Sequence, residues 1–344
     1  MAYFVSDVVE QLDLRAIESV YEEGERGQPP YHPRMMTKIL IYGYCVGVFS
    51  SRRIQKKLSE DIGFRVLAAG NQPDFRTISD FRKQHLAGLQ GLFDQVLQIA
   101  LQAGTMKLGR VVLDGSKVKA NASKHKAMSY GRMKEEDKRL KEEVKRLLEQ
   151  AEATDAEEDT RYGRDRTGDE LPAELGRRET RLRRIQEAKR ALEERAKEEA
   201  KSKGKPEEKA KPKAKMQYNF TDPESRIMPG AEGFVQAYNT QIAVEPDFQW
   251  IVGQKVTLTA RCCPPLPQGA TRVDRMRRKL QTKVGAAIYS KRKTVVEPVF
   301  GQIKQARGFR QFLLRGLQKV QAEWALVCLT HNILKLHRLC YGSS

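Results

Sequence analysis

The sequence is poor in cysteine, and the cysteines it has follow no metal-binding or disulfide pattern. Five occur in 344 residues. The number is odd, two of them are adjacent, and no pair has Cys-x-x-Cys spacing. Disulfide frameworks and zinc sites depend on paired cysteines at regular spacings. We therefore expect neither, and we expect a reducing compartment. The cysteines are Cys45, Cys262, Cys263, Cys328 and Cys340.

Long hydrophobic runs are also absent. The longest apolar stretch, residues 39–49, contains Gly43 and Gly47 and is shorter than the ~20 residues that a membrane-spanning helix needs. The first residues, MAYFVSDVVEQLD, carry acidic side chains where a secretory signal has a basic start and an apolar run. We therefore expect a cytoplasmic protein that is neither exported nor embedded in a membrane.

Acidic residues are scarce in the last quarter of the chain. The whole chain has 63 Lys and Arg against 44 Asp and Glu, a formal net charge of +19. Residues 261–344 alone carry 17 basic and 3 acidic side chains, net +14. A partner with closely spaced phosphates favours charge concentrated in this way, whereas a generally basic surface would spread it along the chain. The asymmetry predicts nucleic acid as the partner.

Residues 1–108 have the pattern of several short helices. Pro33 suits the first turn of a buried helix. A later helix would carry Arg52 and Arg53 on one side and Ile54 on the other. Short consecutive helices with basic faces suit a DNA reader of the helix-turn-helix kind, and equally a helical packing or dimerisation domain. The sequence leaves both open.

Residues 109–344 mix strand and helix patterns, which predicts an α/β domain. The run 110–115 is short and apolar and ends in Asp114 and a glycine, so it predicts a buried strand that Asp114 closes. Residues 234–244 and 249–258 predict an antiparallel hairpin. Further helices are expected over residues 272–283, 291–307 and 324–339.

A charged insertion, residues 130–215, interrupts this domain. Two charged helices folded back as a hairpin would bury their narrow apolar stripes against each other. Its tail, residues 201–215, contains prolines and many lysines and predicts a flexible basic linker. We assign the insertion no catalytic role, because a solvated coiled coil is the simpler interpretation. The apolar residues at helical spacing are Leu140, Val144, Leu147 and Ala151, and then Leu182, Ile185, Leu192 and Ala196.

Two acids stand in unusual settings. Asp114 follows an apolar strand, where a carboxylate must be paired, coordinated or hydrogen-bonded. Glu297 lies in the apolar run Val295–Phe300, next to Pro298, which suits the first turn of a helix. Taken singly, each has an ordinary explanation, as a turn residue or a capping acid. Lys304 follows Glu297 by seven positions, so the two would share a helix face that can hold a metal and a phosphate.

Three segments together resemble the DDE transposases of bacterial insertion sequences. They are YSKRKTVVEPVFGQIK, which contains Glu297 and Lys304, VVLDGSKVKAN, which contains Asp114, and FVQAYNTQ at residues 234–241. Residues 31–82 resemble the helical domain that precedes the catalytic domain in that family. The likeness covers nearly the whole chain, and its blocks occur in the expected order.

The resemblance implies a fold and a domain order. An all-α N-terminal domain, residues 1–108, would contact DNA. A ribonuclease-H-like α/β catalytic domain, residues 109–344, would follow and would carry the coiled-coil-like insertion and basic linker at residues 130–215. The partner it implies is DNA at the terminal inverted repeats of a transposable element, and a homo-oligomer is allowed for.

The resemblance also implies a site. Asp114 would be the first and Glu297 the last of the catalytic, metal-binding acids, with Mg²⁺ or Mn²⁺ as cofactor. Lys304 and either Lys293 or Arg292 would match the basic residues that flank the glutamate. Two Mg²⁺ ions can clamp the attacking and leaving oxygens of an in-line displacement at phosphorus. The residues predicted to contact DNA phosphates are Lys304, Lys293, Arg292, Arg52, Arg53, Arg307 and Arg310.

A second catalytic Asp, which the family has, is missing at its expected place. Residues 261–296 contain one acid, Asp274, which is set among basic residues and predicted to be salt-bridged. Asp247 is predicted to lie at the edge of the sheet opposite Asp114, and Asp222 lies in a Thr-Asp-Pro turn. An internal deletion is the simplest explanation. It predicts an incomplete sheet with an unpaired edge and impaired catalysis.

We therefore predict a transposase for DNA transposition and recombination, with Mg²⁺-dependent strand cleavage and transfer impaired by the missing acid. It would act in the bacterial cytoplasm, in association with the nucleoid. Two other functions stay open. A non-catalytic DNA-binding remnant would occupy element ends or inhibit an intact transposase. A coiled-coil interaction protein would be organised around residues 131–215.

Overall fold

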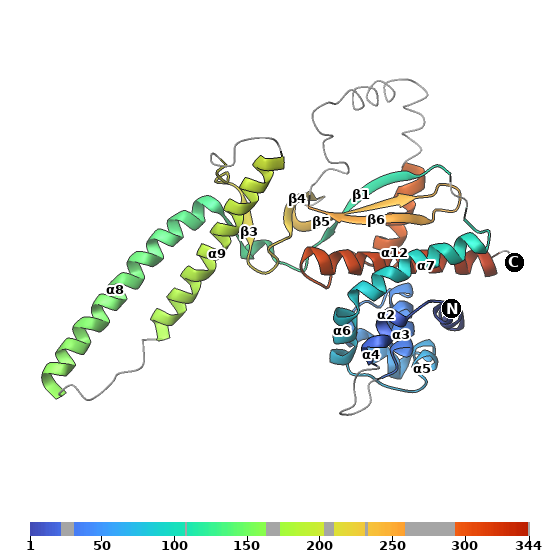
Figure 1. The fold of residues 1–344 in the computed structure, drawn as a ribbon, viewed down its shortest axis with the longest axis horizontal. Helices are drawn as coiled ribbons and strands as arrows, with labels where there is room; N and C mark the ends of the chain where they lie inside the picture. Colours follow the sequence, from blue (N-terminus) through green and yellow to red (C-terminus); the bar gives the residue numbers. More distant parts are fainter. Residues whose placement is uncertain are drawn as a thin grey trace, which may run out of the picture. The chain divides into compact units, whose positions relative to one another are not determined.

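The computed structural model describes seven stretches of the chain, and its contacts divide the chain into two compact units. The larger unit joins residues 1–121 to residues 224–344, and the smaller unit is residues 122–223. Figure 1 shows their elements as ribbons. The boundary predicted after residue 108 falls inside the larger unit. The described residues are 1–21, 31–106, 109–162, 173–202, 210–230, 233–258 and 293–342.

Short α-helices make up the N-terminal part of the larger unit, as the sequence predicts. They are α1 (Ala2–Glu10), α2 (Arg15–Glu18), α3 (Pro33–Cys45), α4 (Ser51–Glu60), α5 (Ile62–Leu67), α6 (Phe75–Gln84) and α7 (Leu86–Gln102). Pro33 is the first residue of α3, which confirms the predicted helix start. His32 precedes it, and its Nδ1 accepts the N–H of Arg34 at 3.2 Å. The carboxylates of Asp61 and Asp74 cap α5 and α6 in the same way.

A four-stranded antiparallel sheet is the second part of the larger unit, and β5 lies in its middle. Its strands are β1 (Val112–Lys119), β4 (Arg226–Gly230), β5 (Gly233–Val244) and β6 (Ile251–Thr257). β1 pairs with one edge of β5, and β4 and β6 share the other edge. The pairing of β5 with β6 confirms the predicted hairpin. Helices and sheet together form a mixed fold.

The strand that carries Asp114 differs from the prediction. Asp114 is the third residue of β1 and does not close it. Val111 and Leu113, in the apolar run that suggested a buried strand, are 47% and 65% exposed, whereas Val118 is fully buried. Val118 lies next to exposed Lys119, and the whole of Val112–Lys119 pairs with β5, so this pairing and not the apolar run before Asp114 determines the strand.

The long helix α12 (Leu317–Tyr341) forms the centre of the larger unit (Figure 1). It confirms the apolar helix predicted over residues 324–339. Every residue from 322 to 333 is buried, which is typical of a helix surrounded by protein. It contacts α1, α3 and α7 as well as β6, so it joins the N-terminal helices to the sheet. In the described stretches, neither α12 nor another helix combines the length and apolarity needed to cross a bilayer.

The smaller unit is a helical hairpin on a two-stranded sheet. β2 (Ala127–Ser129) pairs antiparallel with β3 (Gln217–Asn219), and α8 (Tyr130–Tyr162) packs against α9 (Ala173–Ser202). This confirms the hairpin of charged helices that the sequence predicts. Its shared core consists of Tyr130, Met133, Leu140, Ile185, Ala188 and Leu192.

A buried polar chain connects α3, α6 and α12. Arg82 donates a hydrogen bond to Tyr44 Oη (3.1 Å), and Tyr44 donates one to Glu323 Oε1 (3.1 Å). Glu323 Oε2 accepts the backbone N–H groups of Leu313 and Leu314, both at 3.0 Å. Burial raises the pKa of the Glu323 carboxyl, and the charge of Arg82 opposes that shift. This row of hydrogen bonds therefore depends on the side chains of Arg82, Tyr44 and Glu323 together.

We expect Arg82→Met to destabilise the protein by about 1–3 kcal/mol, because it leaves the buried Tyr44 hydroxyl and the Phe49 carbonyl oxygen without their donor. Urea unfolding followed by circular dichroism measures this loss. Arg53→Met removes the same charge from an exposed site on α4 and should change stability by less than about 0.5 kcal/mol. Equal losses in the two variants would contradict a structural role for the buried chain.

Candidate active site

Asp114 lies near the start of β1, opposite Ile242 of β5. It is half-buried, and its Oδ1 accepts the N–H of Gly115 at 2.7 Å. Because side chains alternate along a strand, Asp114 shares a sheet face with Ser116 and with buried Val118. The carboxylate therefore stands at the partly open end of a face that is buried further along the strand.

Glu297 lies on a helix, and its side chain is exposed. Residues 293–301 are helical, so Glu297 is at least one turn from the helix start, and its predicted place in the first turn is wrong. Val296, Val299 and Phe300 face the core. The apolar neighbours of Glu297 thus occupy one side of the helix and leave the carboxylate on the solvent side.

Lys304 connects this helix to β1. The helix continues into η4 (Gln302–Ala306), a π-helical turn that contains Lys304. The Nζ of Lys304 donates hydrogen bonds to Ser116 Oγ at 2.5 Å and to the carbonyl oxygen of Lys117 at 2.7 Å. It also lies 5.7 Å from the ring centroid of Phe300. π-helical turns are rare and often occur at functional sites. Here the turn carries the lysine that bonds the strand of Asp114.

The ammonium group of Lys304 belongs to a cluster of cations. The exposed Arg310 donates from Nε to the carbonyl oxygen of Lys304 at 3.2 Å. Lys117 donates from Nζ to the carbonyl oxygen of Pro229 at 2.5 Å. Burial lowers the pKa of Lys304 to about 8, and the charges of Arg310 and Lys117 contribute to that shift. Three cations held close together would bind an anion well.

Other predicted phosphate contacts lie on exposed surfaces. Lys293 is exposed on the helix of Glu297, and Arg52 and Arg53 are exposed on α4. The guanidinium carbon of Arg52 lies 4.9 Å from the ring centroid of Phe75. Arg292 lies outside the described residues. The exposed side chains are available to a partner, and no bond holds them together as one site.

Arg307 corrects one prediction, because the structure places it in the core. It is 8% exposed, and its guanidinium donates to Thr330 Oγ1 at 2.8 Å and to the carbonyl oxygen of Val327 at 3.1 Å. Burial lowers its pKa to about 10. Within the described residues its Nε has no hydrogen-bond partner. A guanidinium turned toward α12 is not presented to DNA, so Arg307 is a structural residue and not a phosphate contact.

Asp247 lies in the turn between β5 and β6 and is exposed. Val244, at the end of β5, pairs with Val112, at the start of β1, so this turn is at the same end of the sheet as Asp114. The prediction of opposite edges is wrong, because it assumed that Asp114 closes its strand. The N–H of Asp247 donates to Glu245 Oε1 at 2.7 Å, which explains the turn structurally.

Two other acids were considered for the missing position, Asp222 and Asp274. Asp222 is buried in the smaller unit, where its N–H donates to Asn219 Oδ1 at 3.2 Å. Asp274 lies outside the described residues.

The acids at hand do not fit a two-metal site. Asp114 and Glu297 offer the hard oxygen ligands that Mg²⁺ prefers. Across the described stretches, however, no group of three or more His, Cys, Asp or Glu side chains could hold a metal ion. Two ions about 3.5–4 Å apart need more carboxylates than this pair supplies.

Sequence reasoning missed Ser116, which holds the ammonium group of Lys304. Ser116 follows Asp114 by two residues, the period of a strand, so the alternation of β1 could have indicated it. It also missed the π-helical turn, although Gly301 directly precedes that turn and Gly308 follows it.

Comparison with protein families gives two matches. Residues 266–337 match a family described as a transposase DDE domain. Residues 1–84 match a family described as a transposase domain (DUF772). No curated protein and no solved structure matches the chain. The two matches, at opposite ends of one chain, support a DDE transposase and a role in transposition.

We expect the ammonium group of Lys304 to titrate near pH 8, because it is desolvated and has two cationic neighbours. An ordinary lysine titrates near pH 10.4, about two units higher. Nuclear magnetic resonance of protein labelled at lysine Cε measures the midpoint. Lys304→Arg removes the resonance and so assigns it. A midpoint above about 10 would show that the amine is solvated and not held against β1.

Proposed function

We propose that this chain is a DDE transposase of a bacterial insertion sequence that still binds the ends of its element but has lost most of its cleavage activity. The observation that carries the proposal is the hydrogen bond from Lys304 to Ser116. It joins the C-terminal segment, which matches a transposase DDE domain, to the strand of Asp114, which lies outside that match.

The spacing of the two acids supports one site. Glu297 precedes Lys304 by seven residues, or about 10 Å along a helix. Asp114 precedes Ser116 by two residues, or about 7 Å along a strand. Each acid therefore lies within about 10 Å of the Lys304–Ser116 bond, measured along its own element.

Each residue would have a distinct role toward DNA. Lys304 and Arg310 would hold backbone phosphates, Lys304 as a point charge and Arg310 as a planar fork. Exposed Lys293, Arg52 and Arg53 would add non-specific contacts. Asp114 and Glu297 would bind a divalent cation, which supplies charge neutralisation at the reacting phosphate when bound. The ribonuclease-H-like fold implied by the resemblance would place this site on the sheet.

The missing third acid supports impaired catalysis. Residues 261–296 contain only Asp274 as an acid, in a run of basic residues. A deletion after Ala260 would have removed the block with the second Asp. With two carboxylates, the ions that clamp the attacking and leaving oxygens would bind weakly. DNA binding does not need those ions, because it depends on the exposed cations.

DNA binding should depend on Lys304. We expect the chain to bind duplex DNA taken from the sequences that flank its gene, with affinity that falls as salt rises. Lys304→Ala should weaken binding about tenfold and reduce the salt slope by about 1, the value for one lost phosphate contact. A gel-shift titration at several salt concentrations measures both. Lys319→Ala, at an exposed position of α12, is the matched control and should bind as the wild type does.

Cleavage should fall below detection. Incubation of the same duplex with the chain and Mg²⁺ or Mn²⁺ should release no nicked product on a denaturing gel. Asp114→Asn should therefore leave both the gel pattern and the binding affinity unchanged. Robust cleavage that Asp114→Asn abolishes would show that the site is complete, and that a further acid completes it.

The same observations favour a second candidate, a non-catalytic protein that competes with an intact transposase for element ends. Exposed cations together with an incomplete acid set are what such a protein needs. Adding the chain to an active relative would then inhibit cleavage in proportion to the fraction of ends it occupies. Binding without inhibition would argue against this role and leave the first proposal intact.

A further inference from the structure

The first described side chains of α9 form a strongly basic segment of the insertion hairpin. Residues 176–184, at the start of the described side chains of α9, contain five arginines and one acid, Glu179. The insertion as a whole is nearly balanced, with 26 basic and 23 acidic residues over residues 131–215. The excess is therefore local. The five residues are Arg177, Arg178, Arg181, Arg183 and Arg184.

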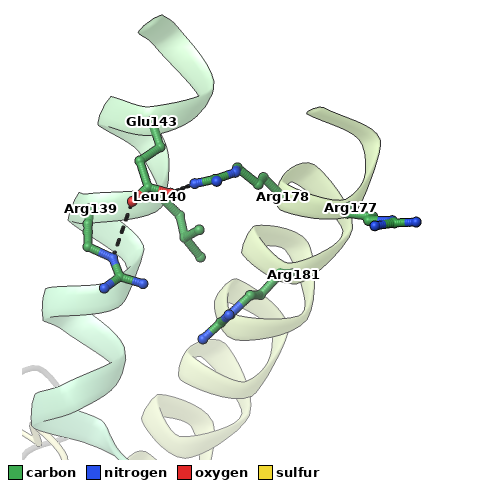
Figure 2. A pocket seen from close by; sticks show the side chains of 6 residues that line it. All are labelled: Arg139, Leu140, Glu143, Arg177, Arg178 and Arg181. Carbon is green, nitrogen blue, oxygen red and sulfur yellow. Dashed lines mark hydrogen bonds and ion pairs between the residues drawn. The ribbon is translucent and has the colours of Figure 1, made fainter. Parts of the chain in front are cut away.

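A hollow between α8 and α9 lies at this segment (Figure 2). Figure 2 shows Arg139 and Glu143 on one helix and the three arginines of α9 on the other, with Arg181 directed toward α8 and Arg177 directed away. Leu140, the apolar member, is 2% exposed. The hollow is lined by four guanidinium groups, one carboxylate and one leucine, from Arg139, Arg177, Arg178, Arg181, Glu143 and Leu140.

The acids near the hollow are already shared between arginines. Glu143 pairs with Arg178 and with Arg139, the latter at 3.5 Å. Glu136 pairs with Arg139 at 2.8 Å and with Arg181 at 2.7 Å. Two carboxylates thus serve three guanidinium groups, and each guanidinium has five N–H donors. Arg177 and Arg184 lie outside these ion pairs and are exposed, so their donors could bind an anion from outside.

The spacing of the arginines indicates the kind of anion. Arg177, Arg181 and Arg184 are exposed and four and three residues apart, so they lie along one face of α9 over about 10 Å. A DNA strand carries one phosphate for about every 3.4 Å of axis. Guanidinium groups bind phosphate through paired hydrogen bonds. The face has no exposed aromatic residue of the kind that anchors protein interfaces, so it suits a backbone of phosphates better than a protein partner.

We propose that this arginine face, defined by Arg177, Arg181 and Arg184, binds the sugar–phosphate backbone of duplex DNA without reading its sequence. The proposal rests on the proposed function in one respect, that DNA is the substrate of the chain. It assigns the insertion a binding role separate from the contacts made by Lys304 and Arg310.

Fluorescence anisotropy with the full chain and a labelled duplex of random sequence tests this, with salt varied between about 50 and 200 mM. The variant replaces Arg177, Arg181 and Arg184 by Ala. We expect its affinity to fall at least about tenfold and its salt slope to decrease by about 2.7, or 0.9 for each lost contact. The control replaces Lys138, Lys145 and Lys197, exposed lysines of the same hairpin, by Ala, and removes the same charge. It should lose less than about threefold.

A second variant excludes a folding defect. Arg177→Glu with Arg184→Glu changes two exposed residues that form no ion pair in the described part of the chain. It should keep the wild-type circular dichroism spectrum and bind DNA more weakly than the triple alanine variant does.

Three outcomes would overturn the proposal. If the triple variant binds DNA with the wild-type salt slope, the arginine face does not contact DNA, although the chain still binds DNA elsewhere. If the lysine control loses as much DNA affinity as the triple variant, the loss reflects the removal of positive charge in general and not of this face. If the triple variant sediments with a different oligomeric mass from the wild type while its DNA affinity is unchanged, the face is a protein interface. A wild-type chain that binds no DNA would instead contradict the proposed function itself.

Discussion

The burial of α12 is the constraint on which the larger unit depends. A helix buried from residue 322 to residue 333 must be covered on every side, and here N-terminal helices and the sheet provide the cover. The polar groups it brings inside must also be satisfied. Glu323 is held by Tyr44 and two backbone N–H groups, and Thr330 receives a hydrogen bond from Arg307. The N-terminal helices therefore cover part of the surface of α12. Residues on both sides of position 108 belong to the same compact unit.

The parts of the fold that follow from local signals could be predicted from the sequence. Pro33 at a helix start, the stripes of the hairpin and the turn between β5 and β6 each leave a short-range pattern. The errors arise where a distant element decides. The start of β1 is set by its pairing with β5, so Asp114 lies near the beginning of the strand and not at its end, where it was predicted. The burial of Arg307 is set by α12, more than ten residues further along the chain, and no local pattern indicates it.

The candidate site combines residues that the sequence could name with a geometry that it could not. Asp114 and Lys304 were evident as members of a resemblance, but their connection through Ser116 depends on a π-helical turn meeting a strand. Desolvation of Lys304 brings its pKa to about 8, so the amine is mostly charged at neutral pH yet poorly hydrated. Such an ammonium group gains more from a phosphate than a solvated one does, because it gives up less water on binding. The site is thus better equipped to bind an anion through its cations than to bind metal ions through its carboxylates.

The position of α12 in the order of synthesis has a consequence for how the chain folds. In sequence, α12 follows all the elements it packs against. As the polypeptide leaves the ribosome, α1, α3, α7 and β6 emerge before the helix that covers their apolar faces. These faces stay exposed until translation of α12, and exposed apolar surface on an incomplete chain promotes aggregation. Folding of the larger unit is therefore completed only after α12 has been synthesised. The hairpin of the smaller unit, whose core contacts are all its own, can form while synthesis continues.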